Sequence, residues 1–191
     1  CLLPNLFSCE KKAEYPKTEF FAMNTYGVIT ADGADKELLQ RLQENVLHIE
    51  KQLSRTYEES EICRLSSGVK PSAETAELLK KLSEISYNTQ GAFDFTLGTL
   101  CELWDVNGEN PHVPRDEDIE EALSHCGYEK VRIGEEDGVY YCDDAQLKPD
   151  LGAAAKGYAG QRQIDTLKRE GIQNAAVNLG GNVSVIGSSP E

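Results

Sequence analysis

The sequence lacks any hydrophobic run of the ~18 to 20 residues that a membrane-crossing helix needs, so we expect no internal membrane span. Positive charge is also scarce, because 19 Lys and Arg face 33 Asp and Glu, a formal net charge of −14. This acidity opposes attraction to phosphate backbones, so we expect no nucleic-acid partner. The 191 residues, 39% of them hydrophobic, are enough for one globular domain with its own core.

Several common site motifs are absent. The six cysteines form no CxxC pair, so the sequence predicts neither a zinc cluster nor a dense disulfide framework. The three histidines show no spacing typical of a metal site or a catalytic triad, and we interpret them as structural. Neither a Walker A loop nor GxGxxG occurs. A nucleotide phosphate would therefore need small residues at a helix start, a lysine or a divalent cation.

The first residues indicate processing. Residues 1–8 are largely apolar, Cys9 follows, and residues 10–14 are largely charged. Residues 6–9 resemble the box at which bacterial lipoproteins are cleaved and lipidated, with Phe7 bulkier than the residue usual there. We therefore predict that 1–17 are a signal-peptide remnant and tether, with Cys9 lipidated, and that 18–191 are held outside the bacterial cytoplasmic membrane by this lipid anchor. The alternative is a locally packed or disordered chain end.

Hydrophobic periodicity predicts an α+β fold with a mixed or antiparallel sheet and packed helices, since strands and helices do not alternate regularly. One long strand is predicted from Thr18 to Ala31, with Gly27 as a bulge. A helix with Asp35 as its cap follows, carrying apolar residues as far as Leu53. The remaining predicted elements are a loop with one helical turn at 56–71, helices at 72–89, 116–125 and 154–170, a hairpin of 130–133 with 139–142, and strands at 175–179 and 182–186.

The segment 149–159 is the most informative. It places Asp150, then small residues, then Lys156 at the start of a helix. Small side chains let a ligand approach the backbone, exposed amides at a helix start attract anions, and a lysine adds positive charge. The segment therefore indicates a phosphate or pyrophosphate site. The alternative is tight packing of the helix on a sheet, with Lys156 in solvent.

Two further segments are candidates. Asp94 lies between Phe93 and Phe95, which in a strand would share one face while Asp94 occupies the other. Core packing with a capping aspartate is the alternative. The paired glycines of 178–182 indicate either a hairpin turn or a close approach of backbone to a flat ligand. Met23 and Tyr57, taken alone, are ordinary core or surface residues.

Together these segments resemble one family. The segments are 22–26, 53–57 with Ser60 and Arg64, 91–94 followed by Leu103 and Trp104, 150–159, and 177–182. They occur in the order found in the ApbE-type FAD:protein FMN transferases. Five matches in register over residues 20 to 187 are far more specific than any one of them. The resemblance implies an ApbE-like, T-fold-related architecture.

The resemblance also implies an activity and a site. It implies an enzyme that uses Mg²⁺ to split FAD at its pyrophosphate and attach FMN to a threonine of an acceptor protein, a membrane redox subunit, with release of AMP. Ala153 matches a position whose backbone carbonyl helps to hold the metal, and Lys156 is a candidate partner of the pyrophosphate. The positions that match the FAD site are Met23, Tyr57, Ala92, Phe93, Asp94, Asp150 and Lys156.

The chain differs from the family pattern at its C-terminus. The family continues beyond the length of this chain and supplies further acidic and threonine ligands of the metal there, so we expect an architecture that is incomplete at the C-terminus. Two other functions stay open. One is an extracytoplasmic lipoprotein that binds FAD without turning it over, and the other is an FAD pyrophosphatase that gives FMN and AMP. A structural fragment without a ligand site is the remaining alternative.

Overall fold

The computed structural model describes residues 15–188, except 66–69, 106–107, 135–139 and 143. The predicted lipidation site, Cys9, lies outside the described residues. The chain forms two compact units. The first comprises the described residues up to Leu47 and those from Gly157 onward, and the second comprises His48 to Lys156.

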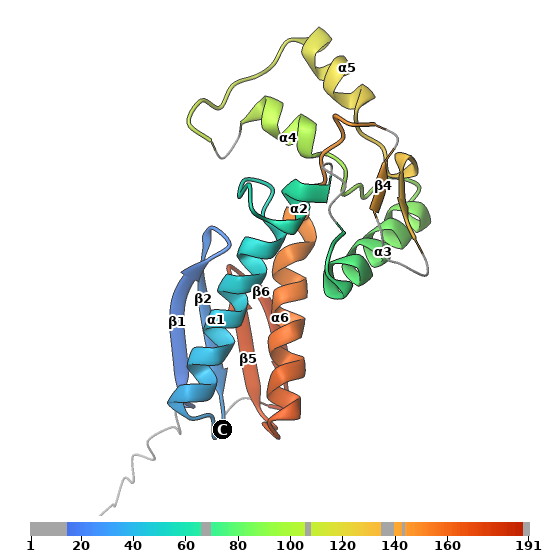
Figure 1. Ribbon diagram of the computed structural model, residues 1–191. Coiled ribbons are helices and arrows are strands. Elements are labelled where there is room, and N and C mark those ends of the chain that lie inside the picture. Colours follow the sequence, from blue (N-terminus) through green and yellow to red (C-terminus); the bar gives the residue numbers. More distant parts are fainter. Residues whose placement is uncertain (1–14, 66–69, 106–107, 135–139, 143, 189–191) are drawn as a thin grey trace, which may run out of the picture. The chain divides into compact units, whose positions relative to one another are not determined.

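The first unit is built on a four-stranded antiparallel sheet with the strand order β1-β2-β5-β6. Helices α1 and α6 lie side by side on one face of this sheet (Figure 1). This arrangement confirms the predicted α+β class. The elements are β1 (Lys17–Ala22), β2 (Thr25–Ala31), α1 (Lys36–Leu53), α6 (Gly152–Arg169), β5 (Ala175–Leu179) and β6 (Asn182–Ile186).

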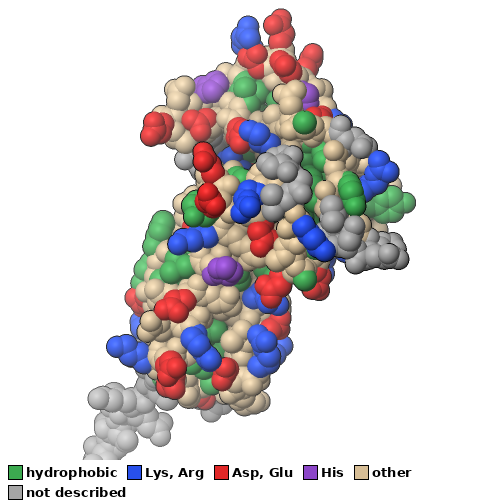
Figure 2. Space-filling view, in the orientation of Figure 1, with side chains coloured by type: hydrophobic (Ala, Val, Ile, Leu, Met, Phe, Trp, Pro, Cys, Tyr) green, Lys and Arg blue, Asp and Glu red, His purple; other side chains and the backbone are tan. Residues whose placement is uncertain are grey.

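The core of the first unit lies between the helices and the sheet. Side chains alternate between buried and exposed along the strands, because successive residues point to opposite faces. Asp35 caps α1 as predicted, since its Oδ1 accepts a hydrogen bond from the Leu38 amide at 2.7 Å. Figure 2 shows Lys, Arg, Asp and Glu side chains interspersed over α1 and α6, as expected for helix faces that meet water.

The prediction of one strand from Thr18 to Ala31 was wrong. The segment is a hairpin, in which Met23 and Asn24 turn the chain with φ of 53° and 55°. Two consecutive positive φ values are the geometry of a two-residue hairpin turn, and asparagine tolerates it. Gly27 is not a bulge, because it stays in register with Phe20 and Leu179. Its missing side chain makes room for the Phe20 ring, which would lie 2.7 Å from a Cβ.

The second unit is mainly helical. Its helices are α2 (Glu61–Arg64), α3 (Ala73–Asn88), α4 (Gly98–Trp104), α5 (Asp116–Ser124) and the 3₁₀ helix η2 (Tyr128–Lys130), and β3 (Val131–Ile133) pairs antiparallel with β4 (Tyr140–Cys142). The predicted cap of α3 is confirmed, since the Ser72 hydroxyl accepts a hydrogen bond from the Thr75 amide. The turn of the predicted hairpin, 135–138, lies outside the described residues.

The residues around Asp94 do not form a strand in which Phe93 and Phe95 share one face. Residues 91–97 form turns and lead into α4, a helix that the sequence pattern did not predict. Phe95 is fully buried whereas Phe93 is half-buried, so the two rings do not share an environment. None of the helices in the described ranges has both the length and the apolar character that crossing a bilayer requires.

Candidate functional site

Asp150 occupies the N-terminus of α6 in the second unit. Its Oδ1 accepts a hydrogen bond from the Gly152 amide at 2.7 Å, which satisfies one of the free N–H groups of the first helical turn. Its Oδ2 lies 2.9 Å from Nε of Arg55 in an ion pair. The two contacts fix the orientation of the carboxylate at the positive end of the helix.

The first two turns of α6 follow the predicted pattern. Gly152 and Ala153 are exposed, and Lys156 is half-buried on the same helix. Within the described ranges, no hydrogen bond or ion pair joins the Lys156 side chain to another residue. Its ammonium group is therefore available to a ligand anion or to solvent. The predicted arrangement of an acid, small residues and a lysine at a helix start is confirmed.

The Asp94 carboxylate holds a turn together. Its Oδ1 accepts hydrogen bonds from the amide and hydroxyl of Thr96, at 2.8 and 2.7 Å. Its Oδ2 accepts one from the Tyr128 amide at 3.1 Å. Thr96 is fully buried and its Oγ1 accepts a hydrogen bond from the Gly127 amide at 2.8 Å. Asp94 therefore fixes the turn that presents Ala92 and Phe93.

The Asp94 turn and the segment leading to Asp150 lie side by side. The Asp150 amide donates to the Phe95 carbonyl at 2.7 Å, and the Gly98 amide donates to the Lys148 carbonyl at 2.9 Å. A Cβ on Gly98 would lie 2.5 Å from the Lys148 carbonyl oxygen, so only glycine permits this approach. Tertiary structure therefore brings together two of the motifs that were singled out in the sequence.

Arg55 and Tyr57 lie on a loop that its own polar groups hold in place. The Ser54 Oγ accepts a hydrogen bond from the Tyr57 amide at 3.1 Å, and the buried Ser60 hydroxyl donates to the Ser54 carbonyl at 2.6 Å. The Tyr57 side chain is 46% exposed, so its ring is available to a flat ligand. Arg55 was not among the predicted site residues, because its partner is remote in sequence.

Met23 belongs to the first unit, unlike the other predicted site residues. It is half-buried in the β1–β2 turn. The β5–β6 turn lies at the same end of the sheet, since a Cβ on Gly180 would meet Thr25 Oγ1 at 2.2 Å. The Gly181 amide donates to Asn178 Oδ1 at 2.9 Å. The paired glycines thus form a hairpin turn, one of the two predicted alternatives.

Comparison with known proteins identifies the family. The sequence matches the ApbE family over residues 23–191. The chain belongs to the ApbE family. It is 30% identical to the FAD:protein FMN transferase of Vibrio cholerae over 194 residues, covering 95% of this chain and 58% of that protein. It is 27% identical to the FAD:protein FMN transferase of Klebsiella pneumoniae over 158 residues, which cover 80% of this chain and 50% of that protein.

Solved structures of the family confirm the fold. The ApbE protein of Thermotoga maritima superimposes with a TM-score of 0.83 at 32% identity, covering 92% of this chain and 60% of that one. The flavin transferase ApbE of Vibrio cholerae gives 0.82 at 25% identity, covering 92% and 61%. The predicted ApbE-like architecture is thereby confirmed. This ApbE-family chain spans about half the length of the curated relatives it matches.

A thiol lies against the Asp150 carboxylate. Burial raises the pKa of Cys101, on α4, and the neighbouring negative charge of Asp150 raises it further, whereas Arg55 acts in the opposite direction. Cys101 is a free cysteine, as are Cys126 and Cys142. The pKa of the Cys101 thiol in this ApbE-family chain thus depends on both charges of the Arg55–Asp150 pair. Nothing in the local sequence indicated this proximity.

The residues that the structure describes do not by themselves form the magnesium site implied by the resemblance. Among them, no group of three or more His, Cys, Asp or Glu side chains could hold a metal ion. Both oxygens of Asp94 and of Asp150 already accept hydrogen bonds or an ion pair. The Ala153 carbonyl alone is too small a ligand set, because Mg²⁺ requires octahedral oxygen coordination. The described residues alone therefore do not complete a magnesium site.

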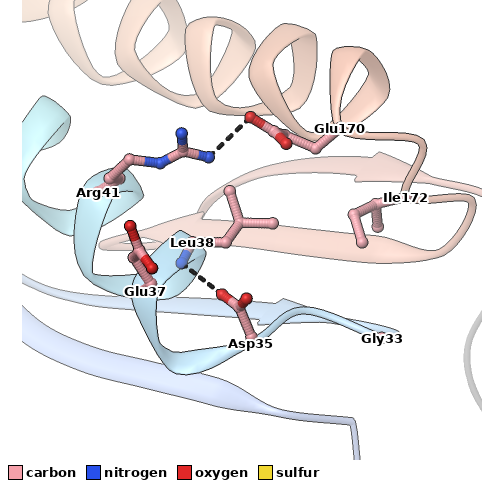
Figure 3. Close-up of a pocket in the computed structure, with 7 residues that line it drawn as sticks. All are labelled: Gly33, Asp35, Glu37, Leu38, Arg41, Glu170 and Ile172. Atoms are coloured by element: carbon pink, nitrogen blue, oxygen red, sulfur yellow. Dashed lines mark hydrogen bonds and ion pairs between the residues drawn. The ribbon is translucent and has the colours of Figure 1, made fainter.

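A hollow lies in the first unit of this ApbE-family chain, between the start of α1 and the end of α6 (Figure 3). Its charged lining residues are Asp35, Glu37, Arg41 and Glu170. Arg41 is already paired with Glu170 at 2.7 Å, and Asp35 caps α1. Three carboxylates against one guanidinium repel a pyrophosphate. This hollow is therefore unsuited to a pyrophosphate.

Proposed function

We propose that this chain forms the flavin-nucleotide-binding part of an FAD:protein FMN transferase, which transfers FMN from FAD to a threonine of an acceptor protein and releases AMP with the help of Mg²⁺. Family membership supports the proposal, as do the names of the relatives. The observation that carries it is the joining of the Asp94 turn to the N-terminus of α6. The two segments that carry the clearest sequence motifs, around Asp94 and Asp150, thus meet at a helix N-terminus that can bind an anion.

Each residue has a distinct part in binding. The amides at the start of α6 and the ammonium group of Lys156 attract the pyrophosphate of FAD. Tyr57, which is exposed, and Phe93, which is half-buried, offer aromatic faces to the flat rings of the ligand. Ala92, with its small side chain, leaves room beside Phe93. Asp94 acts indirectly, by fixing the turn that carries both.

The reaction exchanges the phosphoanhydride link within the pyrophosphate of FAD for a phosphoester link to the acceptor threonine. The threonine hydroxyl oxygen of the acceptor attacks the phosphorus of the FMN half, and the bond from that phosphorus to the bridging oxygen breaks. AMP leaves with the bridging oxygen, and the hydroxyl proton passes to solvent. Holding the pyrophosphate still beside the acceptor is the contribution that the described residues make to this step. Mg²⁺, when bound, neutralises phosphate charge.

A second function has an observation in its favour. Gly152 and Ala153 at the start of α6 are exposed, so water can reach the same phosphates. With water as the attacking group the products are FMN and AMP, which is an FAD pyrophosphatase. Binding without any turnover is the third outcome, an FAD-binding lipoprotein.

One experiment separates the three functions. The chain is incubated with FAD and a threonine-containing acceptor protein, with and without Mg²⁺, while flavin fluorescence, AMP release and the mass of the acceptor are followed. Transfer gives AMP and a flavinylated acceptor in equal amounts. Hydrolysis gives AMP and free FMN, and a holding protein gives bound FAD alone. Absence of all three contradicts the proposal for this chain.

Lys156→Ala is the decisive variant, and Lys168→Ala is its matched control in the last turn of the same helix. Lys156→Ala removes a positive charge beside the proposed pyrophosphate, so FAD binding weakens by roughly tenfold, as for the loss of one charge-assisted hydrogen bond. Lys168→Ala leaves FAD binding unchanged. Equal FAD affinities of the two variants would remove Lys156 from the site.

We further propose that the protein is held outside the bacterial cytoplasmic membrane by lipid on Cys9, facing an acceptor that is a membrane redox subunit. The sequence pattern around Cys9 supports this location. Labelling with a radioactive fatty acid tests it. Wild-type protein should incorporate label in cells and Cys9→Ala should not, and equal labelling of both would contradict the proposal.

A further inference from the structure

The Arg55–Asp150 ion pair is partly shielded from water. The two side chains are 24% and 19% exposed, whereas those of the Arg41–Glu170 pair are 55% and 42% exposed. Shielded pairs are screened less by solvent and salt, so their charges act more strongly on their surroundings. The Arg55–Asp150 pair also stands at the start of α6, the proposed pyrophosphate site. The net charge of this pair therefore affects the binding of an anionic ligand at this helix end.

Asp150 alone would oppose such a ligand. Its carboxylate already occupies the positive end of α6 through the Gly152 amide, and its negative charge would repel a pyrophosphate that approached the same helix end. The guanidinium of Arg55 offsets this charge from 2.9 Å. Asp150 thereby keeps its hydrogen bond to the Gly152 amide, while Arg55 removes the repulsion that the Asp150 charge would exert on an incoming anion.

The backbone around Arg55 is itself fixed. The Arg55 carbonyl accepts a hydrogen bond from the Cys63 thiol at 3.1 Å, and the Ser60 hydroxyl closes the loop on the Ser54 carbonyl. A constrained loop holds the guanidinium at the Asp150 carboxylate with little loss of conformational entropy. The contact is therefore a defined feature of the folded unit.

We propose that Arg55 is the positioning residue of this site: it holds the Asp150 carboxylate on the start of α6 and cancels its charge, so that this helix end accepts the pyrophosphate of a dinucleotide. This inference rests on the proposed function. It assigns Arg55 a role in affinity for phosphate-bearing ligands, without contact between Arg55 and the reacting atoms.

The test compares two ligands that differ in phosphate. Arg55→Gln removes the charge and keeps a polar side chain, and fluorescence titrations give the Kd of FAD and of riboflavin, which has no phosphate. The Kd of FAD should rise by roughly tenfold, as when a charged hydrogen bond is lost, while that of riboflavin stays the same. Arg55→Lys, which keeps the charge, should restore most of the affinity. Arg41→Gln is the control and changes neither Kd.

A double variant tests the mechanism. Arg55→Gln with Asp150→Asn removes both charges, so FAD should bind more tightly than to Arg55→Gln alone. The alkylation rate of Cys101, measured on its peptide by mass spectrometry, gives an independent readout. Because Arg55 lowers the pKa of Cys101 and Asp150 raises it, Arg55→Gln should slow the reaction and Asp150→Asn should speed it.

The outcomes distinguish the inference from the proposed function. If wild-type protein does not bind FAD, the proposed function fails, whatever the alkylation rates show. If wild-type protein binds FAD and Arg55→Gln binds it equally well, the inference about Arg55 is overturned. Equal weakening of FAD and riboflavin binding would also overturn it, because a merely structural role affects both ligands. If Arg55→Gln does not fold, Arg55→Lys and the double variant carry the same comparison.

Discussion

Replacing Asp94 by Asn tests whether this residue acts through structure. The carboxylate accepts three hydrogen bonds, two on Oδ1 from Thr96 and one on Oδ2 from the Tyr128 amide. An asparagine keeps one acceptor oxygen. In either orientation of its side chain, its NH₂ group faces a backbone N–H donor, that of Thr96 or that of Tyr128. The Thr96 hydroxyl cannot compensate fully, because its oxygen already accepts from Gly127. One hydrogen bond is therefore lost and two donors face each other.

The magnitude follows from these contacts. A hydrogen bond to a charged group contributes about 1.5 to 3 kcal/mol, and an unpaired buried donor costs a similar amount. Asp94 is half-buried, so solvent offsets part of this loss. We expect the free energy of unfolding of the second unit to fall by about 2 kcal/mol, within the range for loss of a buried polar contact.

Urea unfolding at pH 7 measures the effect. Trp104 is the sole tryptophan and lies in α4 of the second unit, so its fluorescence reports that unit. Asp118→Asn is the matched control, because Asp118 pairs with Arg115 on the surface three residues away, and we expect its unfolding curve to match the wild type. A change of less than about 0.5 kcal/mol for Asp94→Asn, the usual scatter of surface substitutions, would refute the structural role.

Two further predictions concern the packing and the pH dependence of the second unit. Gly98→Ala places a Cβ 2.5 Å from the Lys148 carbonyl, so it should destabilise the unit by about 1 to 3 kcal/mol in the same assay, and an unchanged curve would show that the segments can separate freely. The backbone amide of Gln146, and after it the side chain of His125, donate hydrogen bonds that lower the pKa of the Asp144 carboxyl from 3.8 to about 2. The ionised carboxylate therefore stabilises the fold above pH 4, and this stabilisation is lost as the pH falls toward 2. Asp144→Asn should therefore unfold more easily than wild type at pH 7, with a gap that closes toward pH 2, and a gap independent of pH would contradict the assignment.

Local pattern was sufficient for most helices and for the family. Asp35 and Ser72 cap α1 and α3 as predicted, because a capping side chain and the amide it binds are only three residues apart. The ordered motifs were likewise enough to indicate the ApbE family, which the comparison confirmed. The position of Asp150, before the small residues of α6, was also predictable.

The exceptions arose where a turn or a distant partner decides the structure. Residues 18–31 have strand-forming character throughout, so composition could not locate the turn at Met23 and Asn24, which depends on backbone φ. Residues 93–95 alternate as a strand would, yet side-chain bonds of Asp94 to Thr96 and to the Tyr128 amide hold them as a turn.

The sequence by itself determined most of the helices and strands and the family of the chain, because these depend on residues close together in the chain and on the order of its motifs. Only the tertiary structure decided that Arg55 meets Asp150, that Asp94 serves the turn, and that Cys101 senses the ion pair. These contacts join residues from separate elements. Their formation depends on how the whole unit packs, and no local period or spacing encodes that.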